Sequence, residues 1–454
     1  MRYHPSLIFL IGSACLSCSV AQAQTKPKSG KTPQVKFTQY KLANGLRIVL
    51  APDSSAPVIA VSVTYDVGSR NEREGRTGFA HLFEHMMFQG STNVGKGEHF
   101  VLINDNGGSF NGTTNSDRTN YFETLPSNQI DLALFLEADR MRGLDITQQN
   151  LDNQRAVVQE ERRQSYDNQP YGKSREMMSQ LAYKNFAYSH STIGSMADLN
   201  AATLDDVKQF FKINYAPNNA VLALTGDFKI NDAKAKIQKY FGSIPSQPAP
   251  PKVDATEPES RDEQRKTIVD PLARLTRVDI AFKTVPGDDP DYYALSMLGS
   301  ILSRGRTGRL YSALVEKNLA MNANGSQQES RGPGLFTFGA MVPPTGDPKL
   351  VEKAIYDAIE QIQKDGVTGE EMSKAQVSAR AGAFMRMGTA LGKANSLSQN
   401  SVFYNDPGRM NNLVDRLQLV TSSDVQRVAK KYLNKSNRVV IITEPVDDGG
   451  GFNP

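Results

Sequence analysis

The sequence predicts a protein of mixed helices and strands in which one domain plan is used twice. At 454 residues, the chain is too long for one compact core and is expected to form two or three domains. A helical pattern followed by a buried strand at 203–226 returns at 421–443. The residues that recur at one constant offset are Asp206 and Asp424, Val207 and Val425, Asn219 and Asn437, Val221 and Val439, and Thr225 and Thr443. This repeat predicts an internal duplication and therefore two homologous domains.

The composition is that of an ordinary globular protein and gives no sign of a nucleic-acid surface. The net charge is only +4, and the lysines and arginines are scattered without interleaved aromatic residues. Both cysteines, Cys15 and Cys18, lie within the first 23 residues. If those residues are removed, the mature chain has neither cysteine ligands nor disulfide bonds.

Residues 1–23 have the features of a secretory signal peptide. Arg2 precedes a short apolar run, and Ala21-Gln-Ala23 forms a small-residue cleavage site. The apolar run is too short to span a membrane comfortably. We therefore predict export across the inner membrane into the periplasm, with acylation of Cys18 as the weaker alternative. The polar, proline-punctuated residues 24–36 are expected to form a flexible tail.

The first domain is expected at 37–243 and begins with strands. Residues 46–50 and 58–65 are rich in β-branched side chains and are bounded by turn residues, which is typical of strands. A glycine-rich loop, 68–78, then leads into an apolar helix. Residues 118–125 alternate like a half-exposed strand. A strand near a functional site can bind an extended peptide along its edge, and an ordinary structural strand is an equally open interpretation.

The apolar helix contains the residues that suggest chemistry. His81, Glu84 and His85 are the only ionisable side chains in residues 78–90. Positions i, i+3 and i+4 share one face of a helix, so the two imidazoles and the carboxylate converge. Such imidazoles suit a tetrahedral zinc ion, and a carboxylate that does not bind the metal can act as a base. His-x-x-Glu-His is the inverted zinc-peptidase motif. The simpler alternative is a helix with buried structural histidines.

A later helix supplies the third ligand. Helices are predicted at 130–141 and 150–165, and the second contains the neighbouring residues Glu160 and Glu161. Adjacent helix positions point about 100° apart, so only one of the two carboxylates can face the metal. The inward stripe of this helix carries Leu151, Gln154, Val158 and Glu161. We therefore assign Glu161 as the third metal ligand, which leaves the fourth position to water.

The second half repeats the plan without the metal-binding residues. Residues 244–266 are proline-rich and charged, which predicts a linker to a second domain at 267–446 and a tail at 447–454. A helix predicted at 292–302 occupies the place of the metal helix. The residues that stand where the zinc motif would be are Ser296, Gly299 and Ser300. The second domain is therefore expected to serve as a wall, clamp or dimer surface.

Taken together, these motifs resemble the pitrilysin/insulinase type of metallopeptidase, and most closely the short two-domain branch that includes the mitochondrial processing peptidase and bacterial relatives. The resemblance covers 37–445. Its motifs are His81-Leu-Phe-Glu-His85, Gly107-Gly-Ser-Phe-Asn111, Val157-Val-Gln-Glu-Glu-Arg-Arg163, Asp167-Asn-Gln-Pro-Tyr-Gly172, Ile193-Gly194, and Asn218-Asn-Ala through Gly226-Asp227. It implies an α+β fold in which each of two homologous domains is a mainly antiparallel twisted sheet packed with helices.

The resemblance also implies roles for individual residues. Zinc would be bound by His81, His85 and Glu161, Glu84 would be the general base, and Asn111 would help to hold the substrate backbone. A second acidic residue of the family is replaced here by Gln154, which would weaken the tuning of the metal. Away from these motifs, His99 and His190 are expected to be structural.

One departure bears on the partner. Active relatives carry an Arg and a Tyr that reach the substrate backbone and the tetrahedral intermediate, and their places hold Val315 and Met321. In the short branch, two chains close around a chamber, and the second domain of one chain faces the metal of the other. A homodimer of this chain would lack the pair. We therefore predict a heterodimer with a homologous, zinc-lacking subunit that supplies the Arg and the Tyr.

The sequence thus predicts a secreted zinc endopeptidase that hydrolyses short or unfolded peptides inside a dimeric chamber. Water on the zinc would be activated by Glu84. The first alternative is a catalytically silent binding or assembly subunit of the same fold. The second is a structural zinc module with four protein ligands. Neither a nucleic-acid partner nor a stable membrane span is expected.

Overall fold

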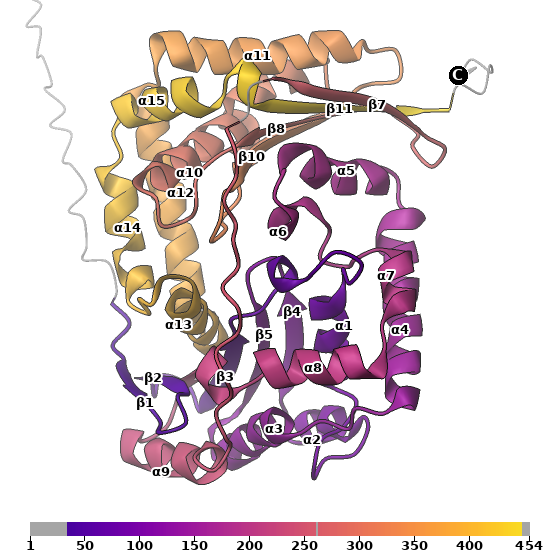
Figure 1. Ribbon diagram of the computed structural model, residues 1–454. Helices are drawn as coiled ribbons and strands as arrows, with labels where there is room; N and C mark the ends of the chain where they lie inside the picture. The colour runs from indigo at the N-terminus through magenta and orange to yellow at the C-terminus, as the bar shows by residue number, and fades with distance from the viewer. Residues whose placement is uncertain (1–33, 260–261, 447–454) are drawn as a thin grey trace, which may run out of the picture. The chain divides into compact units, whose positions relative to one another are not determined.

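The computed structural model describes residues 34–259 and 262–446, and these contain two sheets with attached helices (Figure 1). The predicted signal peptide, most of the predicted N-terminal tail and the C-terminal tail lie outside the described residues. The first sheet consists of β1 (Thr38–Lys41), β2 (Arg47–Pro52), β3 (Val58–Tyr65), β4 (Ser109–Thr114), β5 (Thr119–Pro126) and β6 (Ala220–Gly226). Its order is β1-β2-β6-β3-β5-β4; β2 and β6 are parallel and the other pairs are antiparallel.

The second sheet repeats this topology. It consists of β7 (Gln264–Asp270), β8 (Arg277–Lys283), β9 (Asn322–Gln327), β10 (Leu335–Met341) and β11 (Arg438–Pro445). Its order is β7-β11-β8-β10-β9, with β7 and β11 parallel and the other pairs antiparallel. The α+β class and the two homologous, mainly antiparallel sheets are therefore confirmed. β7 begins at Gln264, inside the stretch whose composition predicts a linker.

The duplication extends to individual hydrogen bonds. Helices α8 (Leu204–Asn214) and α15 (Ser422–Tyr432) both begin with a capping box. After each helix, an asparagine side chain turns back toward it. The side-chain amide of Asn219 donates to the carbonyl five residues earlier at 2.8 Å, and that of Asn437 does the same at 2.9 Å. The constant offset in the sequence is therefore a repeated local structure.

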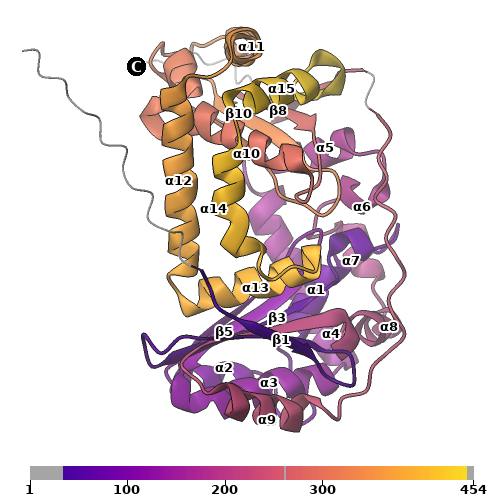
Figure 2. The same ribbon diagram turned by 90° about the vertical axis from the view of Figure 1, so that its left-hand side faces the viewer.

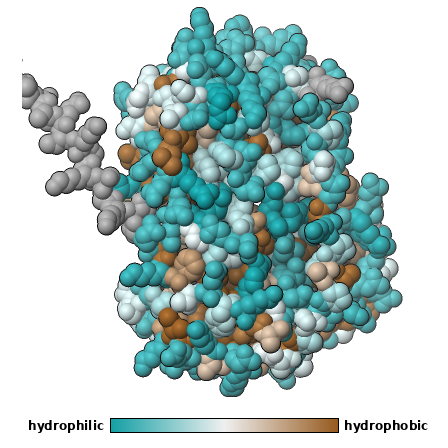
Figure 3. All heavy atoms as spheres, turned by 60° about the vertical axis from the view of Figure 1, so that its left-hand side comes forward, coloured by the Kyte–Doolittle hydropathy of each residue, from teal (hydrophilic) through white to brown (hydrophobic). Residues whose placement is uncertain are grey.

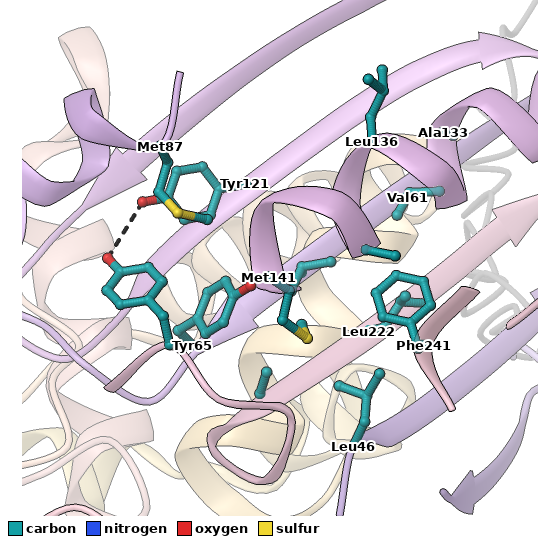
Figure 4. Close-up of a cluster of buried hydrophobic side chains, with 14 of the residues drawn as sticks. Leu46, Val61, Tyr65, Met87, Tyr121, Ala133, Leu136, Met141, Leu222 and Phe241 are labelled. Atoms are coloured by element: carbon teal, nitrogen blue, oxygen red, sulfur yellow. Dashed lines mark hydrogen bonds between the residues drawn. The ribbon is translucent and has the colours of Figure 1, made fainter. Parts of the chain in front are cut away.

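One face of the first sheet packs against helices of the same half of the chain. These helices are α1 (Phe79–Met86), α2 (Glu98–Asp105), α3 (Ile130–Arg142), α4 (Gln148–Arg162), α8 and α9 (Ile230–Phe241). Figure 4 shows part of this core, in which Val61 and Leu222 of the sheet meet Leu136 and Met141 of α3 and Phe241 of α9. These side chains are almost fully buried, and this burial is the main force that holds α3 and α9 on the sheet.

The other face of the first sheet is covered by helices from the second half. Helix α13 (Ala390–Tyr404) lies across this face, and α12 (Gly369–Met387) and α14 (Arg409–Leu419) contribute side chains to the same buried cluster (Figure 2). Ala60 and Val221 of the sheet pack in one buried cluster with Leu397 of α13. At the centre of this contact, Ser62 and Thr64 of β3 both hydrogen-bond the hydroxyl of Ser398, at 2.9 and 2.8 Å.

The second sheet receives a matching cover from the first half, in addition to its own helices α10 (Pro290–Ser303) and α11 (Pro348–Asp365). Short helices α5 (Gly172–Ala182) and α6 (Phe186–Ser189) bring Tyr183 and Tyr188 against Ala281 and Val439. The hydroxyl of Tyr183 donates to the carbonyl of Pro333 at 2.9 Å. Each half therefore supplies part of the other half's core.

Along the described parts of the chain, no helix combines the length and apolar character that crossing a bilayer requires. Apolar side chains on the face shown in Figure 3 are scattered among hydrophilic ones.

Candidate metal centre

Helix α1 is short, and its apolar side packs into the hydrophobic core of the first half. The helix follows Gly78, which adopts a left-handed conformation with φ of 85°. A Cβ atom there would lie 2.5 Å from the carbonyl oxygen of Ile193, so only glycine fits. Phe79, Leu82, Phe83 and Met86 are buried. Burial of one such large side chain contributes about 1.5–3 kcal/mol. The opposite side of the helix carries His81, Glu84 and His85.

The two histidines meet Glu161 of α4 across the helix pair. His81 Nε2 lies 3.6 Å from Glu161 Oε1, and His85 Nε2 lies 3.3 Å from Glu161 Oε2. The imidazole rings are 4.9 Å apart and nearly perpendicular. One nitrogen or oxygen of each of the three residues lies within 4.8 Å of the others. The structure therefore brings together the three residues that the sequence assigns as ligands.

Glu160 lies apart from this group. Its exposed carboxylate accepts hydrogen bonds from Arg163 and Gln164, both at 3.0 Å. Gln154 is buried about two helical turns before Glu161, on the same side of α4 as Leu151 and Val158. A single π-helical turn, Arg163–Asp167, follows α4 directly. Such turns are frequent at functional sites.

The charges in this group suit a cation. Burial and the neighbouring His85 lower the pKa of His81 to about 4, although Glu161 opposes the shift. The hydrogen bond from His85 lowers the pKa of Glu161. His81 is therefore neutral and Glu161 ionised near neutral pH, which are the states in which these groups bind metals. Two imidazoles and one carboxylate are zinc ligands of the usual kind, so the residues fit a zinc ion.

Glu84 lies on the side of α1 that faces β4. Its Oε2 accepts a hydrogen bond from the Thr114 hydroxyl at 2.6 Å. A Cβ atom on Gly112 would come within 3.0 Å of Glu84 Cγ and Oε1. Burial raises the pKa of Glu84, while the Thr114 hydrogen bond lowers it. A carboxylate of raised pKa is better able to take up and return a proton near neutral pH.

Thr114 and Gly112 are contributors that the sequence did not reveal. Both lie within a glycine- and threonine-rich stretch that resembles an ordinary turn and strand. Only the pairing of β4 with β5 turns these two residues toward Glu84. Asn111 of the same strand is exposed, and its side chain accepts a hydrogen bond from the Gly112 amide at 2.9 Å. The predicted strand at 118–125 is β5, and it has no free edge for a peptide because β3 and β4 pair with its two sides. The unpaired edge belongs instead to β4, the last strand of the first sheet in the described residues.

The other two histidines in the described residues lie away from this group. His99 Nε2 is buried 3.6 Å from Glu123 Oε2, and Glu137 completes a second close group of possible ligands. Arg140 hydrogen-bonds both carboxylate oxygens of Glu137, so a cation already occupies part of that group. His190 forms an ion pair with the buried Glu72 at 3.0 Å.

The corresponding region of the second half has a different chemistry. Helix α10 carries Ser296, Gly299 and Ser300, of which Gly299 is buried. Val315 ends a π-helical turn, and Met321 is 57% exposed immediately before β9. Neither of these two apolar side chains can donate a hydrogen bond.

Known proteins share this architecture and its two parts. The family model described as "Insulinase (Peptidase family M16)" matches residues 47–195, and the one described as "Peptidase M16 inactive domain" matches residues 201–378. The chain is 28% identical to "Zinc protease PqqE" of Helicobacter pylori, over 90% of this chain and 93% of that relative. It is 23% identical to "Probable mitochondrial-processing peptidase subunit beta, mitochondrial" of Arabidopsis thaliana, over 93% of this chain and 80% of that relative.

Solved structures give the same result. The crystal structure of a protease from Helicobacter pylori superimposes with a TM-score of 0.87 at 28% identity, covering 90% of this chain and all of that one. The fold is also shared with the periplasmic protease PqqL from Escherichia coli, with a TM-score of 0.75 at 18% identity. That match covers 91% of this chain and 48% of PqqL. From the two matching models, the relatives and the repeated fold, we conclude that this chain is a two-domain member of the M16, or pitrilysin/insulinase-type, peptidase family.

Proposed function

We propose that this chain is the zinc-binding subunit of an endopeptidase that hydrolyses short or unfolded peptides. The observation that carries the proposal is the convergence of His81, His85 and Glu161 from two helices, with Glu84 beside them. The similar protein from Helicobacter pylori is named a zinc protease, which supports zinc-dependent peptide hydrolysis here. The metal site belongs to the domain at 37–243. The domain at 267–446 has no metal role, in keeping with the description of its family model as inactive.

The proton transfers of this reaction would be carried by Glu84. Zinc, when bound to His81, His85 and Glu161, polarises a carbonyl and lowers the pKa of water to about 7. Glu84 takes the proton from the attacking water and passes it to the leaving amine. The Thr114 hydroxyl holds one oxygen of Glu84, so the other oxygen remains available for the proton. Gly112 leaves space for the carboxylate in front of the strand.

The peptide would lie extended along β4. The free edge of this strand offers main-chain hydrogen bonds that make little demand on the peptide's sequence. Asn111 stands on the same strand and would help to hold the peptide backbone. Folded proteins cannot present such a segment, which limits the substrates to short or unfolded chains.

The complete enzyme would be a heterodimer that encloses a chamber. Val315 and Met321 cannot stabilise a peptide backbone or a negatively charged intermediate as an Arg and a Tyr would. A homologous subunit without zinc would supply that pair. The Arabidopsis relative is named as a subunit of a larger peptidase, which is consistent with this arrangement. The signal peptide predicted at residues 1–23 would direct the enzyme to the periplasm.

The test is purification of this chain from its native cells together with its partner, followed by metal analysis and a quenched-peptide assay. We expect zinc, a homologous second subunit, and peptide cleavage that a chelator abolishes. Glu84→Gln should keep the zinc but lower kcat by about 10²–10⁴-fold, because only the proton acceptor is lost. Glu160→Gln, on the exposed side of α4, is the matched control and should leave kcat unchanged.

Three results would contradict parts of this proposal. Full activity of the chain alone would exclude the heterodimer. A zinc-loaded complex whose activity is unaffected by Glu84→Gln would favour the alternative, a silent binding or assembly subunit. A fourth protein ligand on the bound zinc would indicate a structural metal site.

A further inference from the structure

Helix α1 is capped by a carboxylate from outside the helix. Its own N-cap residue, Gly78, has no side chain to accept a hydrogen bond from the first turn. Instead, Glu72 Oε2 accepts from the Gly78 amide at 2.9 Å, and Oε1 accepts from the Ala80 amide at 2.8 Å. The Glu72 side chain is completely buried. Helices α8, α12 and α15 begin with capping boxes of their own, so the helix with the metal motif is held differently.

The partner of Glu72 is His190, and the surroundings of its ring show its protonation state. Nδ1 lies 2.8 Å from the Phe186 carbonyl oxygen, and Nε2 lies 3.0 Å from both the Ser69 carbonyl oxygen and Glu72 Oε2. Carbonyl oxygens only accept hydrogen bonds, so both ring nitrogens must donate. The ring is therefore an imidazolium. It stacks on the ring of Phe186, with the two ring centroids 4.4 Å apart. Burial opposes this charge, but Glu72 and the two carbonyls raise the pKa of His190. Burial also raises the pKa of Glu72, while His190 and the Gly78 and Ala80 amides act in the opposite direction and favour its ionised form.

The segment that carries His190 also binds α4. We define the clamp as residues 186–198. Arg162, next to Glu161, donates hydrogen bonds to the Gly194 carbonyl and to Glu176. On the other side, the Ser195 amide donates to Thr77 Oγ1 at 3.0 Å, just before α1. The clamp therefore contacts the start of one ligand-bearing helix and the end of the other.

We propose that Glu72 and the charged His190 are positioning residues, which hold α1 in the register that brings His81 and His85 over Glu161. The inference rests on the proposed zinc function and adds a control of it. The two residues contact no ligand side chain, so they act through the first turn of α1 and through the clamp. Zinc should therefore bind more weakly whenever His190 loses its proton.

The other charged groups around the pair already have partners. They are Arg70 with Asp66 and Asp117, Glu176 with Arg162, Asp198 with Thr77, and Asp206 with Arg73 and Arg76. Among the contacts of the described residues, Glu72 is the charged side chain that hydrogen-bonds the His190 ring. The protonation of His190 therefore depends mainly on Glu72. A His whose folded-state pKa is raised keeps its stabilising effect below the unfolded pKa of about 6.5 and loses it as the pH rises through the folded pKa.

The test is zinc affinity, measured by competition with a chelator from pH 6.5 to 9 on the full chain, or on its heterodimer if one is isolated. In His190→Gln, a neutral donor replaces the Nε2 donor. We expect its zinc Kd to be about tenfold higher than that of the native protein at pH 6.5, which is the scale typical of groups that hold a metal ligand in place. This ratio should fall toward one as the pH rises, because the native protein then loses the same charge.

The control is Asp289→Ala, which removes the N-cap of α10, the helix in the corresponding place of the second half. It should lower the thermal midpoint without changing the zinc Kd. If His190→Gln does not fold, His190→Asn keeps the Glu72 cap, places a neutral donor near the position of Nδ1 and should give the same falling ratio. A ratio of one at every pH, or a constant ratio, would overturn the inference alone. Failure of the native protein to bind zinc would overturn the proposed function and this inference together.

Discussion

Helices α1 and α10 occupy the same place in the two halves, and their differences separate fold from chemistry. Each connects a central strand of its sheet to the last strand, from β3 to β4 and from β8 to β9. Helix α1 has 8 residues and one polar side, whereas α10 has 14 residues and is buried over most of its length. The shared plan therefore requires an apolar side on this helix and leaves the residues of the other side free to vary.

The facing strands show the same contrast. In the first half, Gly112 of β4 leaves room for the carboxylate of Glu84. In the second half, β9 also carries a glycine, Gly325, and the helix has one as well: a Cβ on Gly299 would lie 3.4 Å from Ser326 Cα of β9. Helix and strand thus pack directly where the first half holds a carboxylate between them. The Glu84 carboxylate therefore depends on a small residue opposite it, and the second half uses the corresponding space for packing.

The largest effect should come from Glu161, the proposed ligand that α4 adds to the first half. Glu161→Gln should weaken zinc binding by more than about 100-fold, since even groups that only orient a ligand contribute about 10–100-fold. Glu160→Gln, one residue away and exposed, should leave the affinity unchanged. Metal analysis after dialysis, together with chelator competition, measures both. Equal loss in the two variants would show that α4 does not present Glu161 to the metal.

A smaller effect should distinguish the two halves by their acid stability. All histidines after residue 23 lie in the first half, and burial together with Arg140 lowers the pKa of His99 to about 3. A buried neutral histidine stabilises the fold above its unfolded pKa, and this contribution is lost as the pH falls from about 6.5 toward 3. In thermal unfolding of the metal-free protein, His99→Phe should flatten this acid limb.

Glu123, beside His99, should act in the opposite direction. Burial raises its pKa to about 8, so its contribution is lost as the pH rises from about 4.5 through 8. Glu123→Gln should therefore flatten the alkaline side of the same curve and leave the acid side in place. If both variants changed the same side of the curve of stability against pH, His99 and Glu123 would not titrate independently.

The smallest effect should come from two glycines, one in the edge strand of each sheet: Gly112 in β4 and Gly325 in β9. Gly112→Ala would place a Cβ 3.0 Å from the Glu84 carboxylate and should lower peptidase activity about tenfold by displacing it. Gly325→Ala in β9 would place a Cβ 3.0 Å from Phe338 and should cost about 1–3 kcal/mol of stability, with zinc binding unchanged. Thermal melts and zinc titrations of both variants would show whether only the first half couples this position to chemistry.

Local patterns were sufficient to predict the strands and helices near the site. Residues 58–65 form β3 as predicted, because a run of β-branched residues between turns has few other solutions. The helical spacing of the zinc motif brought His81 and His85 together, and the inward stripe of α4 selected Glu161 over Glu160. Each of these inferences depends on periodicity within one element, which a single sequence records directly.

Contacts between distant segments could not be predicted in this way. Nothing in residues 390–404 indicates that they form a helix against β3 and β6, because the buried partners lie more than 160 residues away in the sequence. Glu72 and Thr114 were missed for the same reason. Their roles depend on which backbone amide or carboxylate the fold places beside them, and a lone Glu or Thr in a loop gives no such indication.

The exchange of helices between the halves has a consequence for any attempt to separate them. A fragment ending near residue 243 would leave Val49, Ala60 and Val221 facing water, and a fragment starting near residue 264 would do the same to Ala281 and Val439. Two such fragments produced together should instead associate, since each carries the helices that cover the exposed apolar face of the other. A cut in the intervening stretch would therefore nick the chain without dividing the molecule.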